Sequence, residues 1–305
     1  MFAILGATGK VGGATARELR RRGLPVRAIV RDATSDKAQA LAAAGCTLTI
    51  ADIHDTAALT EALTGVSAAL VLCPLTRGSN NTLAESAQRT ADLGIALAQA
   101  RPLHIVALSD YGAHHPTGTG VAAIFHRLEQ HLRTSPSPPP SSAPPSTWKT
   151  GPASSAPPPK PEPSVPATSP LPAPSTIWSA DLAAIAADLL TSPAAPTNSP
   201  RVIHAEGPRR YTPAEMATTA AALADRPIAG DELPHDQWLP TLLARGLGET
   251  HAQLVTEMYA AHNAGKIEVE PGGEIRHGTT TLTQAYAALL GLAPVVTPPV
   301  RGCFS

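Results

Sequence analysis

The sequence predicts an α/β protein with a doubly wound parallel sheet, a Rossmann fold, followed by a smaller and mainly helical carboxyl-terminal part. Three observations support this fold class. Short apolar runs alternate with amphipathic stretches over residues 1–134, a glycine turn separates the first run from the first helix, and helical periodicity returns after residue 178. Strands separated by helices of this length imply right-handed crossovers and a parallel sheet.

Five apolar runs in the first segment are predicted strands. They are continuous rather than alternating, which is typical of strands that are covered on both faces. The amphipathic stretches between them are predicted helices. The strands are expected at 2–5, 25–30, 46–50, 67–73 and 104–108, and the helices at 10–22, 36–44, 55–64, 80–100 and 121–133.

The chain divides into three segments, with a Rossmann domain over 1–134 first. Half of its 32 prolines fall between residues 135 and 176. Because proline lacks an N–H donor and disfavours helix, 135–177 is predicted to be a disordered, Pro/Ser/Ala-rich segment without regular elements.

The third segment, 178–305, supplies the remaining Rossmann elements and a carboxyl-terminal part on the substrate side of the domain. Thr212, Pro213 and Glu215 have the spacing of a capping box with proline at the first helical position. A strand is expected at 201–207, and helices are expected at 179–190, 212–224, 236–245, 250–264 and 279–290.

The glycine turn "LGATGKVGG" lies directly between the first strand and the first helix. In this context Gly6 permits a tight turn, Gly9 a close approach to a pyrophosphate, and Gly12 close packing of helix on strand. The free N–H groups at the helix start would bind the phosphates of a dinucleotide. The alternative is a plain glycine-rich connector. The residues predicted to hold the dinucleotide here are Gly6, Ala7, Thr8, Gly9, Lys10, Val11 and Gly12.

The ends of the second and third strands indicate which dinucleotide binds. A ribose 2′-hydroxyl requires a carboxylate there, whereas a 2′-phosphate requires an arginine. Arg31 comes first after the second strand, before Asp32, and favours NADP(H) over NAD(H); the alternative is a solvated charge at the end of the strand. Asp52 could meet the adenine amine, or it could be a turn residue before the next helix.

Several motifs resemble those of the NmrA-like, atypical short-chain dehydrogenase family. They are "ILGATGKVG", "VRAIVRD", "ADIHD", "LVLCP" and "ALSDYGA", with "EGPRRYTPAEMA" and "EMYAAHNAG" later in the chain. The resemblance implies an NADP(H)-binding Rossmann domain whose carboxyl-terminal part closes over a substrate cleft. It also implies cofactor contacts from Arg31, Asp52, Ile53, Leu72, Cys73 and Pro74.

That family includes NAD(P)H-dependent reductases, quinone reductases among them, and redox-inactive regulators that sense the cofactor and act through a protein partner. We expect an oxidoreductase that reduces a quinone or a similar small acceptor. The alternatives are the regulatory role and a damaged, non-functional gene product.

The tyrosine–lysine dyad of short-chain dehydrogenases is absent from this chain. The residues four positions after Tyr111, Tyr211, Tyr259 and Tyr286 are His115, Glu215, Asn263 and Leu290. Ser109, which follows the fifth strand, and His126, which Glu129 could orient from one helical turn away, are the candidate catalytic residues. Each could instead be structural, Ser109 as a turn cap and His126 in a solvated helix contact.

Composition argues against other classes. The net charge of −1 and the lack of a basic run do not suggest direct binding of nucleic acid or an anionic membrane. Three widely spaced cysteines form neither a disulfide framework nor a zinc pattern, and the amino terminus does not read as a signal peptide. We expect a cytoplasmic protein without a metal site.

The proline-rich segment has a second interpretation at the level of its codons. When the reading frame begins one nucleotide earlier, the shifted codon that overlaps those of Trp148 and Lys149 must encode glutamate. In the same frame, the codons of residues 140–151 can encode "TILRPxFNMENW". That string is the family segment expected at this point. We therefore expect 137–178 to be read out of frame, with weak or no cofactor turnover from the chain as written; the alternative is a true proline-rich linker.

Overall fold

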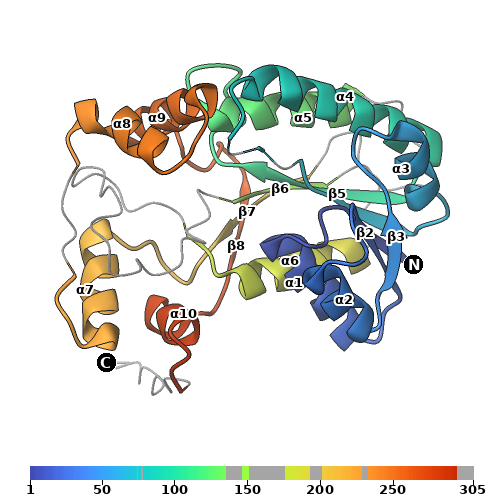
Figure 1. Cartoon of the computed structure of the whole chain (residues 1–305), viewed down its shortest axis with the longest axis horizontal. Coiled ribbons are helices and arrows are strands. Elements are labelled where there is room, and N and C mark those ends of the chain that lie inside the picture. Colours follow the sequence, from blue (N-terminus) through green and yellow to red (C-terminus); the bar gives the residue numbers. More distant parts are fainter. Residues whose placement is uncertain are drawn as a thin grey trace.

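The computed structural model describes residues 1–73, 75–76, 78–134, 146–150, 176–192, 201–228 and 233–293. Within these residues the strands form one parallel sheet in the order β3-β2-β1-β4-β5-β6-β7-β8 (Figure 1). The predicted α/β fold with a doubly wound parallel sheet is confirmed. The strands are β1 (Phe2–Ile4), β2 (Val26–Val30), β3 (Thr47–Ile50), β4 (Ala68–Val71), β5 (His104–Asp110), β6 (Ser146–Thr150), β7 (Val202–Glu206) and β8 (Glu274–His277).

Helices cover both faces of the sheet (Figure 1). One face carries α3 (Thr56–Leu63), α4 (Thr82–Ala100) and α5 (Val121–Thr134), and the other carries α1 (Lys10–Arg21), α2 (Asp36–Ala43) and α6 (Ser179–Thr191). Each face has its own buried apolar cluster. The central strands β1 and β4 contribute to both clusters, which is why their sequences are apolar at every position.

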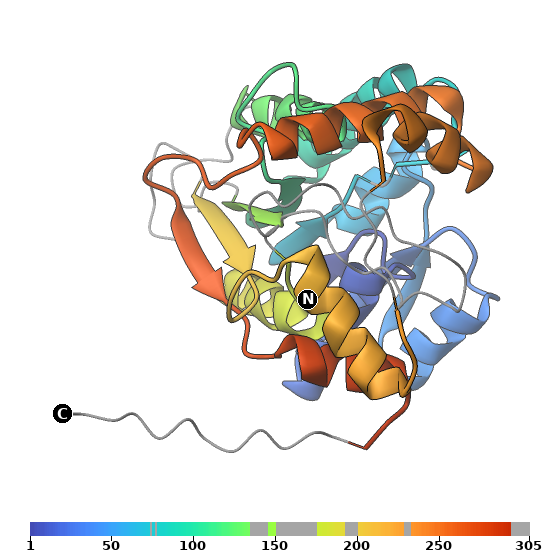
Figure 2. The ribbon, with the colours of Figure 1, turned by 90° about the vertical axis from the view of Figure 1, so that its left-hand side faces the viewer.

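The remaining helices lie beside the sheet in two groups (Figure 2). The first group is α8 (His235–Ala244) and α9 (Glu249–Asn263), which lie along α5, and the second is α7 (Pro213–Ala224) and α10 (Leu282–Leu289). A buried cluster that includes Ile124, Leu242 and Leu254 joins α5 to α8 and α9. The backbone N–H of Glu249 at the start of α9 also donates to Oδ1 of Asn80, 2.8 Å away. The carboxyl-terminal part is therefore attached to the loop that follows β4.

The prediction that 135–177 contains no regular element is wrong for one stretch. Ser146–Thr150 form β6, which pairs in parallel with β5 on one side and β7 on the other. This stretch is free of proline and lies between Pro145 and Pro152. Every residue of this stretch therefore has a backbone N–H that can donate to one of the two neighbouring strands, β5 or β7. Of the rest of the predicted segment, 135–145 and 151–175 lie outside the described residues, and 176–177 have no regular structure.

Two local features of the third segment bear on the sequence predictions. The capping box at Thr212 and Glu215 is present at the start of α7, with Pro213 in its first turn. The strand β8 was not predicted, because its sequence "EIRH" contains only one large apolar residue. In the structure its positions alternate between half-buried and exposed. A strand at the edge of a sheet needs no continuous apolar run, so periodicity alone gave no signal for it.

Candidate cofactor cleft

The glycine turn connects β1 to α1 and leaves the start of that helix open. Gly6 has a φ of +67°, and the N–H of Gly9 donates to the carbonyl of Gly6 at 2.9 Å. Gly9 is the N-cap of α1, and within the described residues no side chain caps the helix and no acidic residue occupies its first turn. The first N–H groups and the positive end of the helix dipole are thus available to an anion.

Gly12 is where the helix comes closest to the turn. A Cβ atom placed on Gly12 would lie 2.4 Å from the carbonyl oxygen of Gly6 and 3.2 Å from Cα of Ala7. Only glycine allows this separation, so the sequence of the turn and the position of α1 depend on each other. The roles predicted for Gly6 and Gly12 from spacing match the backbone geometry found here.

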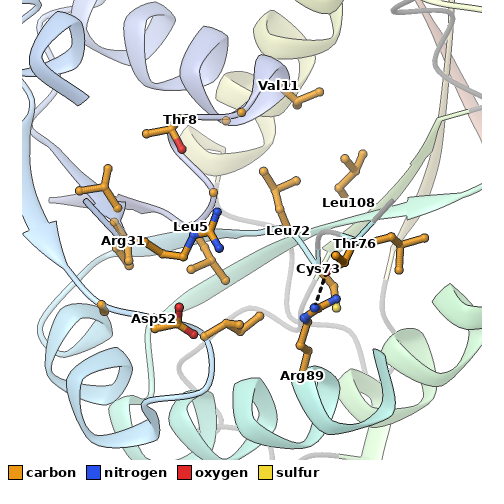
Figure 3. Close-up of a pocket in the computed structure, with 18 of the residues that line it drawn as sticks. Leu5, Thr8, Val11, Arg31, Asp52, Leu72, Cys73, Thr76, Arg89 and Leu108 are labelled. Carbon is orange, nitrogen blue, oxygen red and sulfur yellow. Dashed lines mark hydrogen bonds between the residues drawn. The ribbon is translucent and has the colours of Figure 1, made fainter. Parts of the chain in front are cut away.

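A cavity of about 720 Å³ opens in front of the glycine turn, along the carboxyl ends of β1, β2, β3 and β4 (Figure 3). An elongated dinucleotide fits a cavity of this size and position. Among the predicted cofactor residues, those that line it are Gly6, Thr8, Gly9, Lys10, Val11, Gly12, Arg31, Asp52, Ile53, Leu72 and Cys73. Ala7 is instead buried within the turn, and Pro74 lies outside the described residues.

Arg31 and Asp32 have different environments although they are neighbours. The side chain of Arg31 lies in the cavity between the glycine turn and Asp52 (Figure 3). Asp32 accepts hydrogen bonds from the hydroxyl and the N–H of Thr34, and these bonds lower the pKa of its carboxyl. Asp32 is therefore engaged with its own loop, and Arg31 is the charged residue that the end of β2 offers to a ligand.

The loop after β3 forms the wall opposite Arg31. The carboxylate of Asp52 accepts from the N–H of His54 at 2.9 Å, so Asp52 has the turn role that the sequence left open while it also lines the cavity. His54 lines the cavity as well, and its Nδ1 lies 2.9 Å from Oδ2 of Asp92 on α4. His54 was not among the predicted site residues.

The end of the cavity away from Arg31 is largely apolar. Leu72, Cys73, Leu75, Leu108 and Phe125 line it. Burial raises the pKa of the Cys73 thiol, so the thiol stays neutral and adds no charge to this surface. A planar, uncharged ring system is the kind of group that such a surface accepts.

The two candidate catalytic residues lie next to the cavity rather than in its lining. Ser109 is buried, and its hydroxyl donates to Oε1 of the buried Glu129. His126 is half-buried, with Nδ1 2.9 Å from the carbonyl oxygen of Ala113. Glu129 therefore accepts a hydrogen bond from Ser109, and His126 contacts the backbone carbonyl of Ala113. Their catalytic role stays a prediction.

Tyr111 has a structural role. Its ring is fully buried, and its hydroxyl donates to Glu206 at the end of β7 over 2.9 Å. Arg210 donates to Glu206 and also to Glu268, both over 2.7 Å. This cluster, Tyr111–Glu206–Arg210–Glu268, ties the end of β5 to the carboxyl-terminal part.

The sequence analysis missed Arg89, which comes from α4 and lines the cavity. Its Nη2 donates to the hydroxyl of Thr76 over 2.7 Å, drawn as a dashed line in Figure 3, and to Glu85 over 3.1 Å. A single arginine in an amphipathic helix forms no motif, so the sequence alone does not mark Arg89 as a residue of the cavity. Only the pairing of α4 with the loop after β4 brings it to the cleft.

Searches of the described part of the chain give two negative results. No group of three or more His, Cys, Asp or Glu residues there could hold a metal ion. None of the helices described is both long and apolar enough to cross a membrane.

Residues 1–100 match the sequence model of the NmrA-like family. An NmrA-like family domain-containing oxidoreductase from Aspergillus japonicus is 39% identical over 98 residues, which are 32% of this chain and only 29% of that protein. The NAD(P)H azoreductase of Xenophilus azovorans is 26% identical over 309 residues, covering 96% of this chain and 100% of that protein.

Solved structures share the fold over nearly the whole chain. Triphenylmethane reductase from Citrobacter sp. has a TM-score of 0.72 at 18% identity and covers 95% of this chain and 99% of its own. An NADPH-dependent quinone oxidoreductase from Escherichia coli, complexed with NADPH, has a TM-score of 0.69 at 23% identity, covering 95% and 100%. The family match over residues 1–100, the fold and the glycine turn agree, so the resemblance to the NmrA-like family that the sequence predicts is confirmed.

Proposed function

We propose that this protein is an NADPH-dependent oxidoreductase that reduces a quinone or a similar planar acceptor. The observation that carries the proposal is one continuous cavity that has Arg31 at one end and the open start of α1 in its middle. Its other end is lined by Leu72, Leu108 and Phe125, together with Arg89, which is hydrogen-bonded to Thr76. The azoreductase and the quinone oxidoreductase among its relatives support the same class of reaction.

The residues of the cleft fit NADPH. The glycines of the turn keep side chains away from the backbone at the point where a diphosphate would meet the N–H groups of α1. Arg31 would bind the 2′-phosphate as a charge-assisted hydrogen-bond donor, because its guanidinium offers a fork of N–H groups. When bound, NADPH supplies a hydride from its nicotinamide ring.

The apolar end suits hydride transfer to a quinone. Leu72, Leu108 and Phe125 would exclude water from the reacting rings and hold the acceptor flat. A quinone that accepts a hydride becomes a stabilised hydroquinone anion, which takes its proton from water. The missing tyrosine–lysine dyad is therefore compatible with this acceptor.

The test is a steady-state assay of NADPH oxidation with a benzoquinone and, separately, with an azo dye. The assay uses the chain as written and a version that carries the shifted-frame segment in place of 137–178. We expect saturable turnover with at least one acceptor, and higher turnover from the restored chain. Saturable NADPH binding without turnover in either version would contradict the enzyme and favour the redox-inactive regulator.

Replacing Arg31 is expected to change cofactor choice. Arg31→Ser should weaken NADPH binding about tenfold, the effect of losing one partly exposed charge-assisted hydrogen bond, and should leave NADH binding unchanged. Titration of each variant with both cofactors measures this. Arg226→Ser, which removes an exposed arginine outside the cavity lining, is the matched control and should change neither affinity. An equal loss for NADPH and NADH in Arg31→Ser would contradict the assignment.

A further inference from the structure

His54 is held in the cleft wall by two residues of α4. Its Nδ1 lies 2.9 Å from Oδ2 of Asp92, a carboxylate that is 8% exposed, and the other oxygen of Asp92 accepts a 2.8 Å hydrogen bond from Nε2 of Gln88. His54 itself lines the cavity and keeps about half of its side chain exposed (47%). The imidazole is therefore anchored on one side and open on the other.

The anchor determines which nitrogen carries the hydrogen. A carboxylate only accepts hydrogen bonds, so Nδ1 of His54 must be the N–H donor toward Asp92. In the neutral ring Nε2 then has a lone pair and is an acceptor. Within the described part of the chain, no hydrogen bond to this Nε2 is found. His54 lines the cavity, and its neutral ring carries one hydrogen-bond acceptor, Nε2, in a tautomer fixed by Asp92.

We propose that Nε2 of His54 accepts a hydrogen bond from the exocyclic amine of the adenine ring, with Asp92 and Gln88 as the residues that fix its tautomer. This inference rests on the proposed NADPH binding, which places the adenosine beside Arg31 and Asp52 at this end of the cavity. The exocyclic amine is the donor that the base edge of adenine presents next to its ring acceptors. Asp52 also lines this end of the cavity; its Oδ1 accepts from the N–H of His54, and its second oxygen is a further acceptor.

The arrangement selects against a 6-oxo purine. A hypoxanthine ring has a carbonyl oxygen where adenine has the amine, and this oxygen would face the lone pair of Nε2. The site therefore distinguishes adenine from hypoxanthine by the exocyclic amine, in addition to the stacking and shape that any purine provides.

The experiment compares binding of NADPH with binding of its hypoxanthine analogue, at about pH 8, where histidine rings are ordinarily neutral. The unmodified protein should bind the analogue about three- to tenfold more weakly than NADPH, the effect expected of one lost and partly exposed hydrogen bond. Equal affinities would overturn the inference while leaving NADPH binding established. If NADPH itself does not bind, the proposed function and this inference both fail.

Asp92→Asn tests the role of the anchor. Gln88 donates to the oxygen of the residue at this position, so the new amide would turn its NH₂ group toward His54. Nδ1 would then become the acceptor and Nε2 the donor. The preference should reverse, with the hypoxanthine analogue bound more tightly than NADPH. A purely structural role for Asp92 would weaken both ligands alike, and that result would overturn the assignment.

His54→Phe is the second variant, and it tests whether His54 recognises the base even if Asp92→Asn does not fold. It keeps a ring in place but removes the acceptor, so the two cofactors should bind equally. His235→Phe, at an exposed histidine of α8 that does not line the cavity, is the matched control and should keep the original preference. Undiminished discrimination in His54→Phe would refute the inference.

Discussion

Gly12→Ala is expected to weaken NADPH binding about a hundredfold. The new Cβ would lie 2.4 Å from the carbonyl oxygen of Gly6 and 2.9 Å from its carbonyl carbon, and both are backbone atoms that cannot rotate away. The turn or the start of α1 must shift, which displaces the N–H groups that would bind the diphosphate. Losing one or two charge-assisted hydrogen bonds, at about 1.5–3 kcal/mol each, weakens binding about a hundredfold. Isothermal titration with NADPH measures the effect.

A matched control separates this effect from general damage. Gly78→Ala places a Cβ where nothing lies within 4 Å and should leave NADPH affinity unchanged. The unfolding free energy of Gly12→Ala should fall by about 1–3 kcal/mol, as expected of overpacking, which leaves the protein folded in the titration. Wild-type affinity in Gly12→Ala would show that the glycine turn does not hold the cofactor.

The second large effect is expected on stability, from Arg210→Met. Arg210 donates to the buried Glu206 and to Glu268. Its removal leaves the Glu206 carboxylate without its cationic partner, while the hydroxyl of Tyr111 still donates to it. Removing one partner of a buried charge pair lowers the free energy of unfolding by about 3–5 kcal/mol. Because Arg210 keeps 28% of its side chain exposed, we expect the lower end of that range. Equilibrium unfolding in urea measures it.

Two further variants test the cause. Arg201→Met removes an arginine that pairs with Glu274 where both side chains are about 40% exposed, and should cost about 1 kcal/mol or less. Adding Glu206→Gln to Arg210→Met should restore part of the lost stability, because no unpaired charge is then buried. Equal losses in Arg210→Met and Arg201→Met would contradict a special role for the buried cluster.

The same cluster predicts acid sensitivity. Burial raises the pKa of Glu206, but hydrogen bonds from Arg210 and Tyr111 outweigh it, so the pKa is lowered overall from 4.5. A carboxyl whose pKa is lower in the folded state than in the unfolded state stabilises the protein at pH values above its unfolded-state pKa. This contribution is lost as the pH falls through the folded-state pKa. Unfolding free energy should therefore fall below about pH 4.5, and less steeply in Glu206→Gln. Identical acid profiles would contradict this.

The Rossmann half could be predicted from sequence because its signals are local. A glycine turn and continuous apolar runs each depend on a few adjacent residues, so Gly6, Gly12 and the first five strands lie where they were expected. The capping box at Thr212 in the carboxyl-terminal part was predictable for the same reason. The same holds for Arg31, whose position after β2 follows from the strand order alone.

The rest depends on contacts between distant segments. His54 and Arg89 reach the cleft only because α4 packs beside the loops after β3 and β4, and no spacing in the sequence announces that packing. β6 was missed because proline content was averaged over a segment in which five residues without proline fill a gap between β5 and β7. Ser109 and His126 were chosen from strand order and helical spacing, which do not show whether a side chain reaches the cavity.

The most direct test of this account is a binding titration of the purified protein with NADPH and with NADH. A diphosphate on the open start of α1 beside the guanidinium of Arg31 predicts saturable, one-site binding of both, with NADPH the tighter. No saturable response to either dinucleotide, in the chain as written and with the shifted-frame segment restored, would contradict it.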